Sequence, residues 1–366
     1  MTRILIAFLL LGTANAALAQ SCGEIPHRVS VLRDGARVDW SRSQHGLIAF
    51  DRAEPKASPY FDVYVMSLDN PHKPTCLTCG QKSAPGLKKH KGNPAWHPSG
   101  DYIVFQAETD ARSSAKFANP GRGVNNVLWL TDAGGSWFVQ LTPTSVEPLA
   151  TGVLHPHFSE DGRKLSWTEQ YSKWEPGEEG KLAGSWRLMS ADFDIVNGRP
   201  QLSNVKGFVP MVEGFYENHG FSPDGKLLIF SSNAGRSGYL ARINNDIFTL
   251  DPETNVVTAL TSVKYNEHAS YFPSGRKILW MTDRDVRGSG TELWVMNPGG
   301  TVPPNGGEQR LTFINDQACA ADYMEGGVIV ADSSVNAQGN KIVAFGQNGL
   351  LGDYGSILLI ELDVPF

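Results

Sequence analysis

Short apolar runs along this chain alternate with polar turns rich in proline, aspartate and glycine. The clearest case is Phe221 to Asn233, in which an aromatic residue precedes Ser-Pro-Asp-Gly and the apolar run Leu227–Phe230. Proline presets φ for the first turn position, and glycine supplies the left-handed residue that lets a chain reverse. This stretch predicts a β-hairpin, with the aromatic residue at the end of its first strand.

The hairpin pattern recurs along the chain. Further copies begin at the aromatic residues Trp96, Phe158 and Phe272, and two weaker copies begin at Trp40 and Tyr323. A repeat of this kind determines architecture more reliably than local propensity does. Together with the first hairpin, these copies predict six similar units in a row.

Each unit also has a second half, in which another strand is followed, after a turn, by a short strand carrying Leu-Thr. Four strands per unit and six units are typical of a β-propeller. A single blade cannot bury both of its faces, so the blades must stack around an axis. We therefore expect an all-β fold, a six-bladed β-propeller with four-stranded blades. The Leu-Thr pairs are Leu77-Thr78, Leu141-Thr142, Leu260-Thr261 and Leu311-Thr312.

The two ends of the repeat predict how the ring closes. Arg28–Leu32 has the pattern of a short strand but no hairpin partner beside it. The last unit supplies Tyr323 to Asp332 and Ile357–Ile360, but then ends without its Leu-Thr strand. We expect the N-terminal strand to complete the last blade, because closure removes the open sheet edges that invite aggregation.

The first residues have the pattern of a cleaved signal peptide. The segment from Met1 to about Ala19 has one basic residue, Arg3, the apolar run Ile4–Leu11 and the small-x-small sequence Ala17-Leu18-Ala19. The apolar run is too short to span a bilayer as a stable helix. We expect a periplasmic or secreted protein, with residues 1–19 removed and residues 20–366 forming one propeller domain.

Four cysteines leave several possibilities open. A lipoprotein would need a cysteine at the cleavage point, and Cys22 lies two residues later. In an exported chain, four cysteines allow three disulfide pairings. Cys76 and Cys79 have the spacing of a redox or zinc pair, yet the residues between them are the Leu-Thr of the repeat. A local disulfide or two buried thiols is the simpler interpretation of that pair.

Charge and composition limit the partners. The formal net charge is −6, or −7 once Arg3 is removed, and the chief basic run is Lys88-Lys89-His90-Lys91. The absence of a basic excess argues against nucleic acid as a partner. No glycine-rich phosphate loop follows a strand and opens a helix, so we expect no nucleotide cofactor. A closed ring satisfies its own strand edges, and we expect a monomer without a membrane span.

Two long insertions indicate which face of the propeller carries function. Thr109 to Asn126 and Tyr171 to Gly184 lie between the second and third strands of their units, and both are too polar to be core. In the usual propeller layout, these loops share a face with the loops that lead into the innermost strands. We call it the top face and expect binding there.

The repeat resembles that of the TolB-like propellers. The resemblance covers about residues 40 to 332 and rests on the Ser-Pro-Asp-Gly turns, Asp283-Arg284-Asp285, Glu292–Asn297 and Gln309–Thr312. It implies an exported propeller that binds an envelope protein, a peptide or a glycan. The separate α/β domain of TolB has no room here, and a Gly-x-Ser-x-Gly peptidase motif does not occur.

Polar residues precede the aromatic residue in several units, where the innermost strands reach the channel. Four of the nine histidines lie at this position, in three consecutive units. Imidazole and carboxylate groups directed at a common axis are the usual ligands of a divalent metal. The candidate ligand-binding and metal-binding residues are Asn93, His155, His157, Glu217, His219, Glu267, His268 and, with Asp316 in the last unit, Gln317.

The same residues resemble part of the site in propeller oligogalacturonate lyases, which hold a metal with channel histidines, one pair of them written His-Pro-His. His155-Pro156-His157 matches that string, with a different offset from the aromatic residue. The resemblance implies that His155, His157 and His268 bind one divalent metal, Mn, Zn or Ca. His219 or an arginine would then be the base for β-elimination on a uronate.

Two functions and one structural interpretation follow from these patterns. The first function is a binding propeller that presents its top face to a protein, peptide or glycan. The alternative is a metal-dependent lyase acting on acidic oligosaccharides. Channel histidines that simply hydrogen-bond to neighbouring blades would serve neither function. Arg284 either forms an inter-blade ion pair or contacts a ligand.

Overall fold

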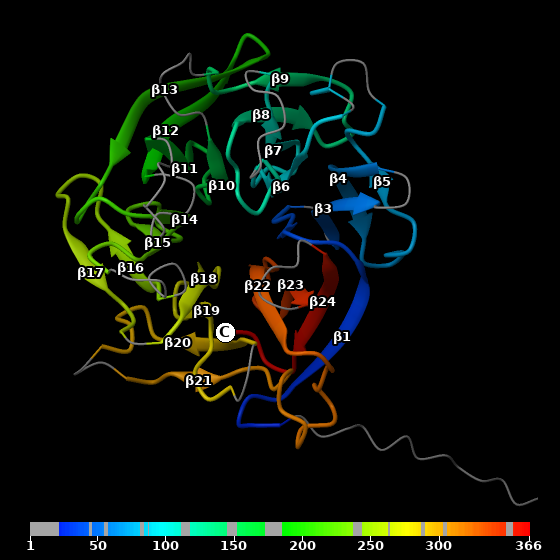
Figure 1. The fold of residues 1–366 in the computed structure, drawn as a ribbon, viewed down its shortest axis with the longest axis vertical. Helices are drawn as coiled ribbons and strands as arrows, with labels where there is room; N and C mark the ends of the chain where they lie inside the picture. Colours follow the sequence, from blue (N-terminus) through cyan, green and yellow to red (C-terminus); the bar gives the residue numbers. More distant parts are fainter. Residues whose placement is uncertain are drawn as a thin grey trace, which may run out of the picture.

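The structure, a computed structural model, describes residues 22–366 except 44–45, 55–57, 81–83, 87, 111–117, 145–151, 173–184, 237–243, 263, 287–289, 303–305 and 349–353. Six sheets stand around one central axis (Figure 1). Each sheet has four antiparallel strands, so the predicted six-bladed propeller is confirmed. The described residues include no helix, and hence none that could cross a membrane.

The first three blades follow the chain from the axis outward. Blade one contains β2 (Val38–Trp40), β3 (Leu47–Glu54), β4 (Ser58–Ser67) and β5 (Thr75–Cys76). Blade two contains β6 (Lys91–Trp96), β7 (Tyr102–Glu108), β8 (Asn126–Asp132) and β9 (Phe138–Gln140). Blade three contains β10 (Val153–Phe158), β11 (Lys164–Ser172), β12 (Ser185–Val196) and β13 (Arg199–Phe208).

The last three blades keep this order until the ring closes. Blade four contains β14 (Tyr216–Phe221), β15 (Leu228–Ser232), β16 (Asp246–Leu250) and β17 (Val257–Ala259). Blade five contains β18 (Asn266–Tyr271), β19 (Ile278–Thr282), β20 (Glu292–Met296) and β21 (Gln309–Arg310). Blade six contains β22 (Val328–Val335), β23 (Lys341–Asn348), β24 (Gly355–Leu362) and, outermost, β1 (His27–Asp34).

The N-terminal strand closes the ring as predicted. β1 pairs antiparallel with β24, so that Val29 lies opposite Ile360 and Val31 lies opposite Leu358. The outer edge of blade six is therefore supplied by a segment that comes before blade one in the sequence (Figure 1). Residues from both ends of the chain share one sheet, which makes closure a cooperative, long-range event.

Two further contacts fix this closure. Cys22, just before β1, forms a disulfide with Cys319, in the loop between β21 and β22. His27 Nε2 lies 2.7 Å from the Asp322 carboxylate, and both side chains are fully or almost fully buried. The other disulfide joins Cys76 and Cys79 locally, so all four cysteines are paired.

The repeated Leu-Thr pair has a structural role that explains its recurrence. In blade five, Leu311 is buried, and the Thr312 hydroxyl accepts the Leu293 N–H at 2.9 Å and donates to the buried Glu292 carboxylate at 2.7 Å. The threonine thus satisfies both a backbone and a side-chain group at the start of the third strand. The third strand bonds in the same way to Thr78, Thr142 and Thr261.

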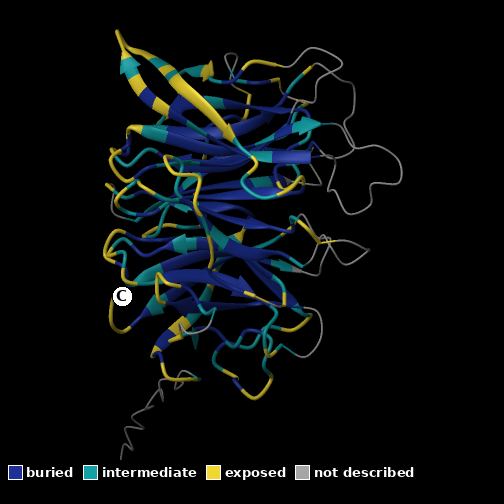
Figure 2. Cartoon of the chain, turned by 90° about the vertical axis from the view of Figure 1, so that its left-hand side faces the viewer, coloured by how far each residue is buried: buried dark blue, intermediate teal, exposed yellow. Residues whose placement is uncertain are grey.

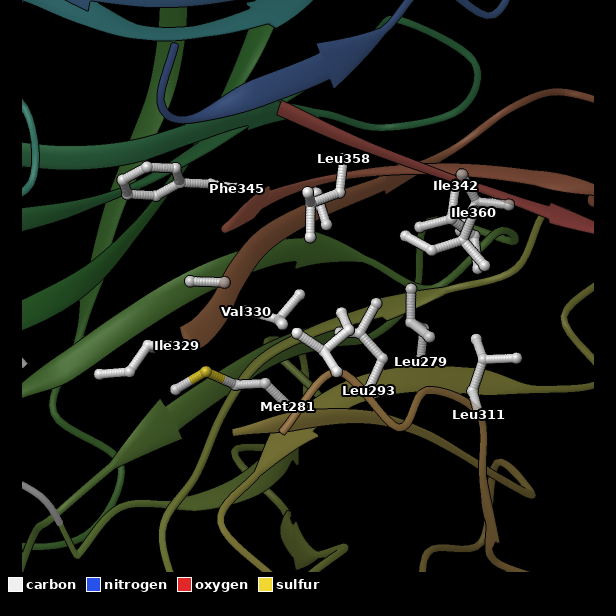
Figure 3. Close-up of a cluster of buried hydrophobic side chains, with 14 of the residues drawn as sticks. Leu279, Met281, Leu293, Leu311, Ile329, Val330, Ile342, Phe345, Leu358 and Ile360 are labelled. Carbon is white, nitrogen blue, oxygen red and sulfur yellow. The ribbon is translucent and has the colours of Figure 1, made fainter. Parts of the chain in front are cut away.

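The hydrophobic core lies between and within the blades. Figure 2 shows buried residues in the interior of the molecule and exposed residues on outer strands and loops, β13 among them. Each fully buried Leu or Ile side chain stabilises the fold by roughly 1.5–3 kcal/mol. Figure 3 shows the cluster where blades five and six meet, which includes Leu279, Met281, Leu293, Leu311, Val330, Ile342, Leu358 and Ile360.

Blade six differs from the prediction in its register. The sequence pattern placed the end of the first strand at Tyr323 and assigned Val328–Val330 to the second strand of the unit. In the structure, Val328–Val330 lies in β22, the innermost strand. The turn between the first two strands of blade six therefore comes later in the sequence than predicted, between β22 and β23. The side-chain oxygen of Asn336 stabilises this turn by accepting hydrogen bonds from the N–H groups of Asn340 and Lys341. This turn contains neither proline nor aspartate, which is why the pattern missed it.

Some predictions fall outside the described residues. The expected signal peptide, residues 1–19, lies there entirely. So do residues 111–117 and 173–184, which make up much of the two insertions expected on the top face. The export signal and the role of these insertions therefore stay predictions.

Candidate functional site

Five innermost strands share the same irregularity. In each of them a β-bulge shifts the register of pairing with the second strand of the blade. The bulge leaves two residues of the innermost strand without a pairing partner in the second strand. A β-bulge changes the direction of a side chain and is frequent beside active sites. The first unpaired residues are Asn93 in β6, His155 in β10, His219 in β14, His268 in β18 and Asp332 in β22.

The bulge residues adopt an unusual backbone conformation. Asn93, His155, His268 and Asp332 have φ angles of 52°, 46°, 48° and 41°, in the left-handed region. Such a conformation costs of order 1–3 kcal/mol at a residue other than glycine and is found mostly at functional sites. In blade four the positive φ belongs instead to Gly220, at 94°. The bulges bring one polar side chain from each of five blades to the channel.

Asp332 and Glu217 hold the imidazole of His155 from two sides. His155 Nε2 lies 2.9 Å from Glu217 Oε1, and His155 Nδ1 lies 3.5 Å from Asp332 Oδ1. The same Asp332 oxygen lies 3.2 Å from Nδ1 of His268. A single carboxylate from blade six thus faces one nitrogen of two histidines from blades three and five. The opposite nitrogens, both Nε2, lie towards glutamates, Glu217 and Glu267 respectively.

His219 completes a group of three imidazoles. Its ring centre lies 6.0 Å from that of His155 and 5.5 Å from that of His268. One nitrogen from each of the three rings can be chosen so that all lie within 4.8 Å of one another. His219 Nε2 also lies 3.0 Å from the Ser231 hydroxyl, which donates to Glu217 at 3.3 Å. We call His155, His219 and His268 the histidine cluster.

The cluster carries a defined charge pattern. Burial disfavours protonation of His268, but Asp332 and Glu217 outweigh burial and raise its pKa to about 10. Burial also disfavours the charged form of Asp332, but the nearby His268 outweighs burial and lowers the pKa of Asp332. Burial lowers the pKa of His219 well below its ordinary value, because Glu217 only partly opposes the effect. Without a metal, His268 is therefore charged at neutral pH and His219 is neutral, so a metal would bind His268 only with release of its proton.

The two glutamates of the site differ in protonation. Burial opposes ionisation of Glu217, but His155 and His268 outweigh it and lower its pKa. Burial and the nearby Glu217 together raise the pKa of Glu267 to about 8. Two close carboxylates cannot both ionise easily, and the environment separates their pKa values. Glu267 is also hydrogen-bonded by Tyr265 and Asn245.

His157 does not join the cluster, in contrast to the prediction that paired it with His155. It is the residue where regular pairing resumes after the bulge, opposite Ser166. Burial, with a smaller contribution from His155, lowers its pKa to about 3, so the imidazole is neutral. It packs against Gly220, where an added Cβ would lie 3.1 Å from the Cβ of His157.

Two other candidate residues lie elsewhere. Gln317 is exposed in the loop between β21 and β22 and donates to the Tyr323 hydroxyl at 3.1 Å. Arg284 pairs with Glu308 at 2.5 Å and stacks over the Trp294 ring, within blade five. The pair is therefore within one blade rather than between blades. Of the predicted residues, the structure brings together Asn93, His155, His157, Glu217, His219, Glu267 and His268, with His157 at the cavity wall but outside the histidine cluster.

Asp332 is the member of the site that sequence reasoning missed. The shifted register of blade six hid it, because the pattern offered Asp316 and Gln317 in its place. In four blades the bulge residue stands three positions before the end of the innermost strand: Asn93, His155, His268 and Asp332. Counting back in the same way from Val335 would have found it.

A small cavity lies at the centre of the site. Its volume is about 30 Å³, enough for a water molecule or an ion. Most of the residues around it are polar, Val38, Pro94 and Ala269 being the exceptions, and they come from several blades. Its lining includes Asn93, His155, His157, His219, His268 and Asp332.

Comparison with known proteins agrees with this architecture. No protein-family model matches the sequence, and no curated protein matches it by sequence either. Among solved structures, an oligogalacturonate lyase in complex with manganese shares 15% identity, with 94% of this chain and 95% of the lyase chain covered and a TM-score of 0.52.

Two longer proteins are also similar. TolB from Acinetobacter baumannii shares 17% identity, with 87% of this chain and 64% of that chain covered and a TM-score of 0.49. A puromycin-hydrolyzing peptidase of Mycobacterium tuberculosis shares 12% identity, with 91% and 46% covered and a TM-score of 0.49. This chain thus spans less than two thirds of either protein. At these identities the likeness shows the fold alone, which is the β-propeller that the sequence predicted.

Proposed function

We propose that this protein is a binding propeller whose central channel holds one divalent metal ion between His155, His219 and His268. The observation that carries the proposal is that one nitrogen from each of the three rings lies within 4.8 Å of the other two. Imidazole nitrogens gathered in this way are the usual ligands of divalent transition metals. Three imidazoles favour Zn over Ca, because Ca takes oxygen ligands, and the nearby carboxylates of Glu217 and Glu267 also suit Mn.

The surroundings of the histidine cluster fit a metal. A carboxylate on the far nitrogen usually fixes the tautomer and orientation of a metal-bound histidine, and Asp332 lies beside Nδ1 of both His155 and His268. Glu217 and Glu267 add carboxylate oxygens, and these residues with His268 also offer ligand atoms within 4.8 Å of one another. When bound, the metal would supply a Lewis-acidic centre that attracts ligand oxygens.

The partner that suits such a centre carries carboxylates. We expect an acidic glycan, a peptide or an envelope protein, bound by a monomeric propeller in the periplasm or outside the cell. The support is the sequence pattern of a signal peptide in residues 1–19, the resemblance of the repeat to that of the TolB-like propellers and the lack of a basic excess. Amino-terminal sequencing of protein recovered from the cell envelope would test export, because cleavage should leave Gln20 as the first residue.

Elemental analysis of the purified mature protein tests the metal site. We expect about one equivalent of Zn or Mn in the wild type and none in His219→Ala. His97→Ala is the matched control, because His97 lies outside the cluster, with its ring against Phe158 and Nε2 bonded to the Gly162 carbonyl. A wild-type protein that takes up no stoichiometric metal after incubation with each ion would refute the proposal.

A second candidate is a metal-dependent lyase acting on acidic oligosaccharides. The observation that favours it is the match to the manganese-bound oligogalacturonate lyase over 94% of this chain. The sequence analysis made His157 a metal ligand and His219 the base. Because His219 lies in the histidine cluster, His219 would instead bind the metal and His157 would be the base. A pKa of about 3 makes His157 a weak base, which is why the lyase is the second candidate.

Product formation decides between the two candidates. The metal-loaded protein would be incubated with polygalacturonate, and the ultraviolet absorbance of unsaturated product would be followed. A lyase gives a rising absorbance that His157→Ala abolishes while the metal content stays unchanged. A binding propeller gives no product but retains the polysaccharide in a pull-down.

A further inference from the structure

Within the histidine cluster, His219 has a different hydrogen-bonding environment from the other two imidazoles. His219 Nε2 lies 3.0 Å from the Ser231 hydroxyl oxygen, and the Ser231 hydroxyl donates to Glu217 Oε2 at 3.3 Å. All three residues are buried, Ser231 completely. Glu217 and His219 lie in β14 and Ser231 lies in β15, so the three side chains form one hydrogen-bonded chain inside blade four.

The register of blade four fixes the place of Ser231. Glu217 and Ser231 lie opposite each other in the antiparallel pair of β14 and β15. Residues that are directly opposite in such a pair point to the same face of the sheet. Ser231 therefore stays beside the Glu217 carboxylate, and the bulge at His219 brings the imidazole to the same hydroxyl.

Counting protons along this chain assigns the tautomer of His219. Burial opposes ionisation of Glu217, but His155 and His268 outweigh burial and lower its pKa, so the carboxylate can only accept hydrogen bonds. The Ser231 hydroxyl has one proton and gives it to Glu217. Its oxygen must then accept from His219, which requires a proton on Nε2. A neutral imidazole has one N–H, so the lone pair of His219 lies on Nδ1.

The other two imidazoles differ in this respect. Both nitrogens of His155 lie near carboxylate oxygens, at 2.9 and 3.5 Å. The same is true of His268, at 3.2 and 3.7 Å. Nδ1 of His219 is the one nitrogen of the cluster beside which the described part of the chain places no hydrogen-bonding partner. It is therefore the nitrogen that can accept a cation without first giving up a proton or a partner.

We propose that Ser231 is a positioning residue of the metal site, which holds the proton of His219 on Nε2 and thereby offers Nδ1 to the metal. This inference rests on the proposed function as far as the metal is concerned, whereas the tautomer of His219 is a property of the metal-free protein. The site would then use unlike nitrogens. His155 and His268 would bind through Nε2, because Asp332 lies at their Nδ1.

Nitrogen-15 NMR spectra of the chelator-treated mature protein, labelled at histidine, test the tautomer. Correlations between ring nitrogens and ring C–H protons distinguish a protonated from an unprotonated nitrogen, and His219→Ala identifies the signals of His219. We expect a protonated Nε2 and an unprotonated Nδ1 in the wild type. On addition of one equivalent of Zn, the Nδ1 signal should shift and Nε2 should keep its proton.

Ser231→Ala removes the hydroxyl that accepts from Nε2. We expect both tautomers of His219 in this variant and about 10-fold weaker Zn binding by calorimetry, the lower end of the effect of losing a partner behind a metal-bound histidine. Ser232→Ala is the matched control. Ser232 is the next residue of β15 and is also buried, but its hydroxyl donates to the Phe215 carbonyl at 2.7 Å. This variant should keep the wild-type tautomer and Zn affinity.

The possible results separate this inference from the metal proposal. A proton on Nδ1 of His219 in the metal-free wild type would overturn the inference, and so would Zn that displaces the proton of Nε2. An unchanged tautomer in Ser231→Ala would leave Ser231 with a packing role and would also overturn it. If the tautomer changes in Ser231→Ala but even the wild type takes up no Zn, the metal proposal fails, while the positioning of His219 by Ser231 stands.

Discussion

The Asp332 carboxylate lies 3.2 Å from Nδ1 of His268, although 64 positions separate these two residues in the sequence. Both residues sit at bulges with positive φ, in the innermost strands of neighbouring blades. The bulge aims each side chain at the axis, and blades five and six are consecutive in the chain and neighbours in the ring. The same Asp332 oxygen also faces His155, so one acidic residue orients two imidazoles.

Asp332→Asn should weaken metal binding without removing a ligand. Loss of a carboxylate behind metal-bound histidines typically reduces affinity 10- to 100-fold, and we expect a loss in this range for Zn. Calorimetric titration of the variant with Zn would measure it. Asp316→Asn, in the half-exposed loop between β21 and β22, is the control and should keep wild-type affinity. Equal affinities for the two variants would show that Asp332 does not position the histidines.

His157→Ala should leave the metal stoichiometry unchanged, because the imidazole of His157 lies outside the histidine cluster. Elemental analysis of this variant beside His155→Ala gives the comparison, since the two residues are separated by only one proline. Metal lost from both variants would favour the assignment made from the sequence, in which His157 was a ligand, over the arrangement in the structure.

The His27–Asp322 pair should make stability depend on pH. Burial opposes protonation of His27, but the bonds to Asp322 and to the Ile25 carbonyl outweigh it and raise its pKa above 6.5. A raised pKa means that the folded state holds the proton more tightly. The stabilisation is complete below pH 6.5 and is lost as the pH rises through the pKa of the folded state.

His27→Gln isolates this effect. Urea unfolding of the wild type and the variant would be compared on both sides of that range. The difference in unfolding free energy should be largest at the acidic end and should shrink as the pH rises. A difference that grows with pH would mean that the neutral form of His27 is the one the fold stabilises.

The disulfide between Cys22 and Cys319 should contribute more to stability than the one between Cys76 and Cys79. The first closes a loop with a sequence separation of 297 residues, and the second closes one of 3. Restriction of the unfolded chain grows with loop length. Replacing both Cys22 and Cys319 by serine should cost about 2–4 kcal/mol, measured by denaturant unfolding.

The matched control is the double serine variant of Cys76 and Cys79, for which a smaller loss is expected. Both variants remove one disulfide and add two hydroxyl groups, so the comparison isolates loop length and position. A larger loss in the control would show that the local disulfide, and not the closure of the ring, limits stability.

Hairpin turns and apolar runs are local features, and the sequence predicted them well. As expected, Phe221 ends β14, Gly225 lies in the turn at a φ of 68°, and Leu228–Ser232 forms β15. Blade six was the exception in register. Its turn is built by the Asn336 side chain rather than by proline and aspartate, so no local signal of the usual kind marked it.

The site was predicted in part. His155, His219 and His268 were identified as channel residues because each precedes the end of an innermost strand. Which of the four histidines faces the axis was not predictable, because a bulge breaks the alternation of side chains along a strand. For this reason the structure places His219 in the histidine cluster, where the sequence analysis expected His157, and leaves His157 outside it.

The amino-acid sequence by itself determined the number of blades, the strands in each and the closing role of the N-terminal strand, because all of these follow from short repeated patterns of apolar and turn-forming residues. Only the tertiary structure decided that Asp332 joins His155 and His268 and that Cys22 pairs with Cys319. These contacts join residues far apart in the chain, and their distances are set by how six twisted sheets close around one axis.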